Sequence, residues 1–149
     1  MYMMEPYNSK KIPVVMVHGL WSNPVTWTKM FNDLRANKWI RDNYQFWFYM
    51  YPTGQPFWLS AGQMRQELRQ VQRDVDPNSE SEAFSQMILV GHSMGGLVSK
   101  MQTIDSNDEF WSIISQRDIG SLNASDEIKS HLQDAVSYTH LTLPTTPYV

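Results

Sequence analysis

The chain has 149 residues, of which 42% are hydrophobic and 18% charged, and its formal net charge is −3. This length predicts one domain with a sizeable core, and the mild acidity excludes the basic surface typical of proteins that bind nucleic acids or anionic membranes. The lack of cysteine excludes disulfides and thiolate metal sites. No apolar run approaches the roughly 18 residues of a membrane span, and residues 1–9 lack a secretion signal. A cytoplasmic location is therefore the default, while compartment and oligomeric state stay open.

The first predicted strand covers residues 12–17, because an unbroken apolar run is typical of a parallel strand that is buried on both faces. We expect it to stop at the His-Gly-Leu run of residues 18–20. Asn23 is a good N-cap and Pro24 a good first residue for the helix that follows. The apolar residues of this helix fall on one face, which predicts packing against the sheet: Trp27, Met30, Phe31 and Leu34.

Residues 44–51 carry aromatic side chains on both alternating faces, which predicts a central strand covered by helices on both sides. A turn at residues 52–56 ends this strand. Ser60 and Gln63 have the spacing of a capping box and predict that a longer helix begins there. The polar residues 76–82 break this helix before the next strand. Its expected buried stripe consists of Ala61, Met64, Leu68, Val71 and Val75.

Residues 87–98 are the most informative segment, since four apolar residues lead through Gly-His-Ser-Met-Gly into a helix. A serine on such a turn is exposed beside main-chain N–H groups, and the tight turn requires small residues at Gly91 and Gly95. Ser93 is therefore predicted to be a nucleophile. The pentapeptide alone arises by chance in about one chain in twenty of this length, so the flanking strand and helix carry the prediction. The alternative is a structural glycine turn without chemistry.

Taken together, the first strand, the His-Gly-Leu run and Gly-His-Ser-Met-Gly-Gly at residues 91–96 resemble the α/β-hydrolase superfamily, most closely its bacterial lipase and esterase branches. The resemblance covers residues 12–104. It implies an α/β fold with a doubly wound parallel sheet and helices on both faces. Only the N-terminal, nucleophile-bearing half of that fold is covered, so the expectation is a truncated α/β-hydrolase fold.

The resemblance also implies roles for individual residues. The main-chain N–H groups of Leu20 and Met94 would form the oxyanion hole. His18 would be a structural residue of the oxyanion loop, and His92 would pack or form hydrogen bonds under the turn, so neither is expected to be the general base. Trp21 follows the first oxyanion donor and is a candidate for the mouth of the pocket. Two further aromatic candidates for the same cleft are Phe57 and Trp58.

In the family the acid and then the base of the triad follow later strands. Residues 106–135 contain no recognisable strand, so no downstream side chain is assigned to a triad. Residues 136–145 back-translate to a sequence that resembles a transposon-end sequencing adapter. We therefore predict a partial hydrolase domain at 1–135 and a non-native tail at 136–149, with a natural β-prone tail as the alternative. The unassigned acids and histidines are Asp105, Asp108, Asp118, Asp126, Asp134, His131 and His140.

The expected function is serine-dependent hydrolysis of carboxylic esters or lipids, with a small-molecule substrate, no nucleic acid, and no metal or organic cofactor. The chain itself is expected to be nearly inactive because the acid and base are missing. Several alternatives stay open on the same fold: a thioesterase, an acyltransferase, a peptidase, or an enzyme that acts on lipid at a membrane. A non-catalytic pseudo-hydrolase that only binds a ligand or partner is the alternative from another class.

Overall fold

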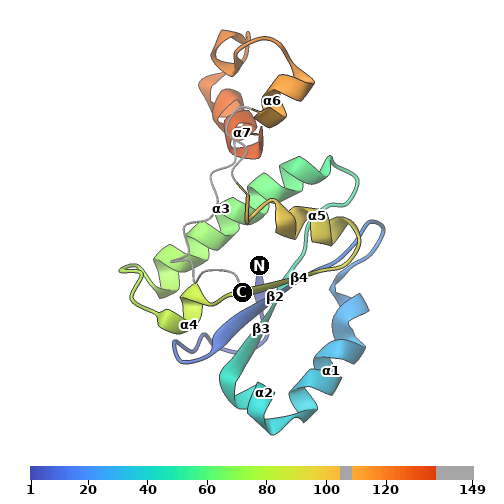
Figure 1. Cartoon of the computed structure of the whole chain (residues 1–149), viewed down its shortest axis with the longest axis vertical. Helices are drawn as coiled ribbons and strands as arrows, with labels where there is room; N and C mark the ends of the chain where they lie inside the picture. Colours follow the sequence, from blue (N-terminus) through green and yellow to red (C-terminus); the bar gives the residue numbers. More distant parts are fainter. Residues whose placement is uncertain (105–108, 137–149) are drawn as a thin grey trace.

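The computed structural model describes residues 1–104 and 109–136 and contains a four-stranded sheet in the order β1-β3-β2-β4 (Figure 1). The strands β2 and β3, and likewise β2 and β4, pair in parallel, whereas β1 pairs antiparallel with β3. The sheet is therefore mixed: the parallel pairing of β2 with β3 and with β4 agrees with the predicted parallel sheet, and β1 adds an antiparallel strand at one edge that was not predicted. The sequence did not predict β1 because a strand of two residues is too short to show a pattern of alternating side chains. The strand bounds are β1 (Tyr2–Met3), β2 (Ile12–Val17), β3 (Tyr44–Tyr49) and β4 (Ile88–Gly91).

The helices lie on both faces of the sheet, as predicted, because side chains alternate along β2 and β3. One set of alternate residues packs against α3, α4 and α5, and the other set packs against η1 and α1. The first set includes Val15, Val17, Trp47 and Tyr49, and the second Val14, Met16, Phe46 and Phe48. The helices in this part of the chain are η1 (Pro24–Trp27), α1 (Thr28–Ala36), α2 (Lys38–Asn43), α3 (Phe57–Val75), α4 (Glu82–Ser85) and α5 (Met94–Lys100).

The two predicted helix starts have different outcomes. Asn23 is an N-cap, and its Oδ1 accepts a hydrogen bond from the Val25 N–H at 2.9 Å, although the first turn is a 3-10 helix. The capping box at Ser60 was wrong, because α3 begins directly after Pro56, which is extended at φ −55° and ψ 136°. Ser60 instead lies buried inside α3, where its Oγ accepts a hydrogen bond from Gln55 at 2.9 Å.

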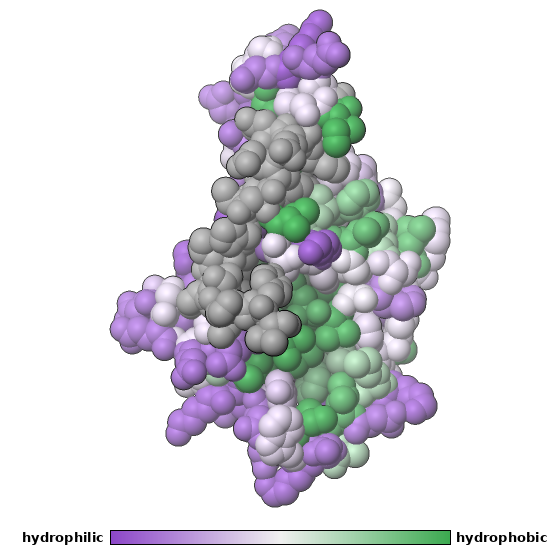
Figure 2. Space-filling model, viewed as in Figure 1, coloured by the Kyte–Doolittle hydropathy of each residue, from purple (hydrophilic) through white to green (hydrophobic). Residues whose placement is uncertain are grey.

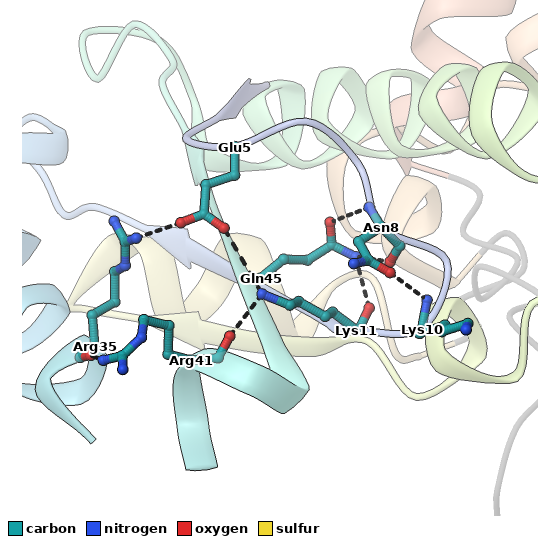
Figure 3. A network of polar contacts seen from close by, with 7 residues as sticks. All are labelled: Glu5, Asn8, Lys10, Lys11, Arg35, Arg41 and Gln45. Carbon is teal, nitrogen blue, oxygen red and sulfur yellow. Dashed lines mark hydrogen bonds and ion pairs between the residues drawn. The ribbon is translucent and has the colours of Figure 1, made fainter. Parts of the chain in front are cut away.

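A polar network holds the segment before β2 to the amino end of the sheet (Figure 3). The Gln45 side chain on β3 is only 3% exposed and accepts a hydrogen bond from the Asn8 N–H at 3.2 Å. Its amide donates to the carbonyl oxygens of Asn8 at 2.8 Å and Lys11 at 2.7 Å. Glu5 forms an ion pair with Arg35 on α1. Side chains therefore make the connections at this end of the molecule.

The strand β4 pairs with β2 on one side and has no second strand beside it among the described residues. Ile88 is accordingly 42% exposed, and Leu97 on the neighbouring α5 is 52% exposed. Figure 2 shows apolar surface over β4 and from there toward α1. An unpaired strand edge with apolar neighbours is a surface that favours association.

Residues 109–136 form a small helical group of α6 (Glu109–Ile114), η2 (Ile119–Ser121) and α7 (Asp126–Val136), which contacts α3. Buried Arg65 on α3 donates to the carbonyl oxygens of Met101 at 2.6 Å and Asp134 at 3.0 Å. Val136 is buried beside Ile119. The other residues of the predicted tail, 137–149, lie outside the described part of the chain, so that boundary stays a prediction.

No helix in residues 1–104 and 109–136 is both long enough and apolar enough to span a membrane.

Candidate active site

The candidate site lies where the carboxyl ends of β2 and β4 meet at one edge of the sheet. Val17 is paired in register with Gly91, and the His92 N–H donates to the Val17 carbonyl at 3.0 Å. The loop after β2 and the turn after β4 are therefore side by side. This edge is the usual position of a ligand site in an α/β sheet.

Ser93 connects β4 to α5 in a strained conformation, as expected for a nucleophile on a strand-to-helix turn. Its φ of 55° and ψ of −125° lie in a region that residues other than glycine rarely adopt. Such a conformation costs about 1–3 kcal/mol and persists only where its surroundings impose it. The Ser93 residue is exposed, and α5 begins at the next residue, Met94.

Three glycines make this turn possible because the main chain packs against itself. A Cβ on Gly91 would lie 2.5 Å from the Gly95 carbonyl oxygen, which no real contact permits. A Cβ on Gly95 would lie 2.5 Å from the His18 carbonyl oxygen and would overlap the carbonyl oxygen of Val17. A Cβ on Gly19 would be 3.0 Å from the Cβ of Ser93. The loop after β2 therefore lies directly against the serine.

The N–H groups at the start of α5 divide into engaged and unengaged donors. Gly95 donates to the His92 carbonyl at 2.9 Å, and Gly96 donates to the Ser93 carbonyl at 2.8 Å. Met94 is the first helical residue, so its N–H has no partner within the helix. Within the described residues neither the Met94 N–H nor the Leu20 N–H makes a hydrogen bond.

The imidazole of His18 is buried, with 1% of the residue exposed, and both of its nitrogens have partners. Nδ1 lies 3.1 Å from the Gly19 carbonyl oxygen, and Nε2 lies 3.5 Å from the Tyr51 N–H. With a proton on Nδ1, that nitrogen donates to the Gly19 carbonyl while Nε2 accepts from the Tyr51 N–H. The ring also stacks on Tyr51 at 4.6 Å between centroids. Such contacts are those of a structural residue.

His92 is exposed, and its ring meets that of Trp27 edge to face, with 6.4 Å between centroids. Both rings line an open groove of about 550 Å³ on the α1 side of the turn, together with Met30, Leu34 and Ile40. His92 therefore packs beside the turn, toward η1 and α1.

The aromatic candidates for the pocket lie in different surroundings. Trp21 is 89% exposed, has a φ of 53°, and donates its N–H to Thr53 Oγ1 at 3.3 Å. Phe57 and Trp58 are at the start of α3, where they are partly buried against the core. A role for any of the three at the mouth of the pocket stays a prediction.

The described residues bring no acid–base pair to Ser93. Asp118 accepts a hydrogen bond from the Gly120 N–H at 2.6 Å, and Asp134 accepts one from Gln66 at 3.0 Å. Asp126 lies in the first turn of α7. The described residues also contain no group of three or more His, Cys, Asp or Glu side chains that could hold a metal ion. The remaining candidates fall outside what the structure describes: Asp105, Asp108, His140 and the side chain of His131.

Two residues of the site went unrecognised in the sequence. The Tyr51 hydroxyl donates to the His18 carbonyl at 2.7 Å, and Thr53 accepts a hydrogen bond from Trp21. Both follow β3, in a segment that the sequence predicts only as a strand end and turn. The available signal was their place at the carboxyl end of a strand adjacent to β2, where loops meet in a parallel sheet.

The fold and the turn at Ser93 define the class: an α/β protein with an exposed, strained serine at the carboxyl edge of its sheet. A family model described as "Putative serine esterase (DUF676)" matches residues 8–148. The match covers most of the chain, so the chain belongs to this family. Comparison with curated proteins and with solved structures finds no match.

Proposed function

We propose that this chain carries the serine nucleophile of an esterase that hydrolyses carboxylic esters, lipid esters included. One observation carries the proposal: Ser93 is exposed at a φ of 55° on the turn between β4 and α5, directly against the loop after β2. Membership in a family of serine esterase-like proteins supports the same class of reaction.

In the proposed reaction the Ser93 hydroxyl oxygen attacks the ester carbonyl carbon while a base takes its proton. The carbonyl oxygen becomes an oxyanion, to which the Leu20 and Met94 N–H groups donate hydrogen bonds. The C–O bond to the alcohol then breaks, and the alcohol leaves with the proton. Water attacks the acyl-serine in the same way, releasing the acid and restoring the serine.

The general base is the part of this scheme that the described residues do not supply. With only an oxyanion hole and substrate binding, an enzyme of this kind retains about 10³- to 10⁴-fold acceleration over water, far below a working esterase. With the described residues alone, we therefore expect esters to be turned over very slowly. A base added in solution, such as imidazole, should accelerate the reaction of Ser93.

Covalent labelling tests the proposal directly. The full chain is incubated with a fluorophosphonate and imidazole, and the modified residue is located by mass spectrometry. The expected result is modification of Ser93 that is lost in Ser93→Ala. Ser79 is a matched control, because it is also an exposed serine with a φ of 55° but follows no β-strand. An unmodified folded chain, or equal modification of Ser79, would contradict the proposal.

The substrate class needs its own measurement. p-Nitrophenyl esters of increasing acyl length, compared with the matching thioester, are followed in the presence of imidazole for wild type and Ser93→Ala. The proposal predicts that the Ser93-dependent rate is higher for the oxygen ester than for the thioester. The reverse order would favour a thioesterase on the same fold.

A further inference from the structure

The segment after β3 contacts the loop after β2 at two points. The Tyr51 hydroxyl donates to the His18 carbonyl at 2.7 Å, and the Trp21 N–H donates to Thr53 Oγ1 at 3.3 Å. We infer that Tyr51 and Thr53 are positioning residues that together clamp this loop and hold the Leu20 N–H in place for an oxyanion. The inference rests on the proposed function and deepens it by naming what sets the geometry of that site.

The positions of the two bonds along the backbone carry the argument. A peptide unit is planar, so its C=O and N–H turn together. The Leu20 N–H belongs to the peptide unit between Gly19 and Leu20. The His18 carbonyl belongs to the unit before it, and the Trp21 N–H belongs to the unit after it. Each bond therefore fixes one neighbour of the unit that presents the Leu20 N–H.

The Tyr51 contact is buried and oriented from several sides. The residue is 5% exposed, and its ring stacks on His18 and also on Tyr49, with 5.3 Å between the tyrosine centroids. Burial raises the pKa of the Tyr51 phenol to about 12, so the hydroxyl keeps its proton at neutral pH. The hydroxyl is thus a permanent donor to the His18 carbonyl.

The Thr53 contact holds Trp21, a residue of the loop that burial does not hold in place. Trp21 has a φ of 53°, which costs about 1–3 kcal/mol for a residue other than glycine. Its side chain is almost fully exposed, so packing against the core does not hold it in that conformation. The Thr53 hydroxyl accepts the Trp21 N–H and so holds the end of the loop opposite to Tyr51.

The loop has little room to adjust on its serine side. A Cβ on Gly19 would lie 3.0 Å from the His92 carbonyl oxygen as well as from Ser93 Cβ. The loop is therefore pressed against the turn on one side and fastened to the segment after β3 on the other. Small rotations of its peptide units would redirect the Leu20 N–H, because hydrogen bonds weaken steeply with angle.

The test compares variants that remove one hydroxyl each. Tyr51→Phe and Thr53→Val delete one bond apiece, and the double variant deletes both. Tyr49→Phe is the matched control, since the buried Tyr49 hydroxyl also donates to a main-chain carbonyl, that of Ser60 at 3.0 Å, away from the loop. Thr53→Ser keeps the hydroxyl and serves as the rescue variant.

The first readout is phosphonylation of Ser93 by a fluorophosphonate in imidazole, resolved into the maximal rate and the half-saturating concentration. Loss of a whole oxyanion donor lowers rates by about 10² to 10³, so misalignment of one donor should lower the maximal rate about tenfold. We expect that loss in Tyr51→Phe and in Thr53→Val, with half-saturation unchanged. Tyr49→Phe and Thr53→Ser should react like the wild type.

The second readout needs no reaction at Ser93. Amide hydrogen exchange over residues 18–21 should accelerate in Tyr51→Phe and in Thr53→Val, and stay at the wild-type rate in Tyr49→Phe. Equal amide exchange at residues 18–21 in all variants would overturn the clamp, whether or not the variants are labelled. An equal loss of labelling rate in Tyr49→Phe and Tyr51→Phe would overturn it as well. A folded wild type that is never labelled would overturn the proposed function and, with it, the clamp's role in chemistry.

Discussion

The two ends of β2 are held in place by different means. At the carboxyl end, main chain packs on main chain at Gly19, Gly91 and Gly95, where no Cβ fits without displacement. At the amino end, the side chains of Gln45 and Glu5 make the connections (Figure 3). An added atom is therefore harmful at the first end, whereas a lost contact is the harmful change at the second. The predictions below test that difference.

The largest effect is expected from Gly95→Ala. The added Cβ would overlap the carbonyl oxygens of Val17 and His18, and backbone atoms cannot move aside as a flexible side chain can. We expect unfolding free energy to fall by about 3 kcal/mol or more, measured by urea denaturation. Gly96→Ala is the control, because its Cβ would meet only the Gly91 carbonyl oxygen at 3.7 Å.

The control itself makes a prediction of opposite sign. Alanine is a better helix former than glycine, so Gly96→Ala within α5 should leave stability unchanged or raise it by up to about 1 kcal/mol. Similar losses of unfolding free energy in Gly95→Ala and Gly96→Ala would contradict this, because they would trace the loss to the start of α5 and not to the close approach of Gly95 to β2.

A smaller effect is expected at the amino end from Gln45→Ala. This change removes three hydrogen bonds, so the Asn8 N–H and the Lys11 carbonyl lose the Gln45 side chain, whereas the Asn8 carbonyl still accepts from the Lys11 N–H at 3.1 Å. We expect a loss of about 1–2 kcal/mol, because these hydrogen bonds are only partly buried and a typical hydrogen bond contributes about 0.5–1.5 kcal/mol net. Gln86→Ala is the exposed control on the same urea assay. A larger loss of unfolding free energy in Gln45→Ala than in Gly95→Ala would contradict the expected difference between the two ends of β2.

The next prediction concerns high pH, at the carboxyl end again. Burial raises the pKa of the Tyr51 phenol from its ordinary value of 10.0 to about 12. The folded protein thus holds this proton more tightly than the unfolded chain, so the contribution to stability is complete below pH 10 and is lost as pH rises toward 12. Tyr51→Phe should show a shallower fall in unfolding free energy over that window. Parallel curves for the two proteins would refute this.

The smallest effect is expected from Glu5→Gln, which removes the partly exposed ion pairs of Glu5 with Arg35 and, at 4.0 Å, with Lys11. Pairs of this kind contribute about 0.2–1 kcal/mol and are screened by salt. The difference from the wild type should shrink further in 1 M NaCl. Lys29→Gln, which breaks the more exposed pair with Asp33, should have still less effect. A salt-independent loss would mean that Glu5 acts through packing.

Local patterns in the sequence predicted the elements that local physics decides. The bounds of β2 and the turn at Ser93 were confirmed, because an apolar run and two glycines leave few alternatives. The start of α3 was missed, since Pro56 allows the helix to begin before Ser60. The contacts of Tyr51 and Thr53 could not be predicted, because they depend on which loops meet after the sheet forms.

The pairing of β2 with β4 also has a consequence for how the protein is made. The turn at Ser93 is imposed by the end of β2, which leaves the ribosome roughly seventy residues earlier, and pairing across so long a loop forms late because loop closure is entropically unfavourable. Until then the serine is an ordinary residue of an unpaired segment. Reactivity at Ser93 would therefore report, during synthesis or refolding, the moment at which the most distant parts of the sheet have joined.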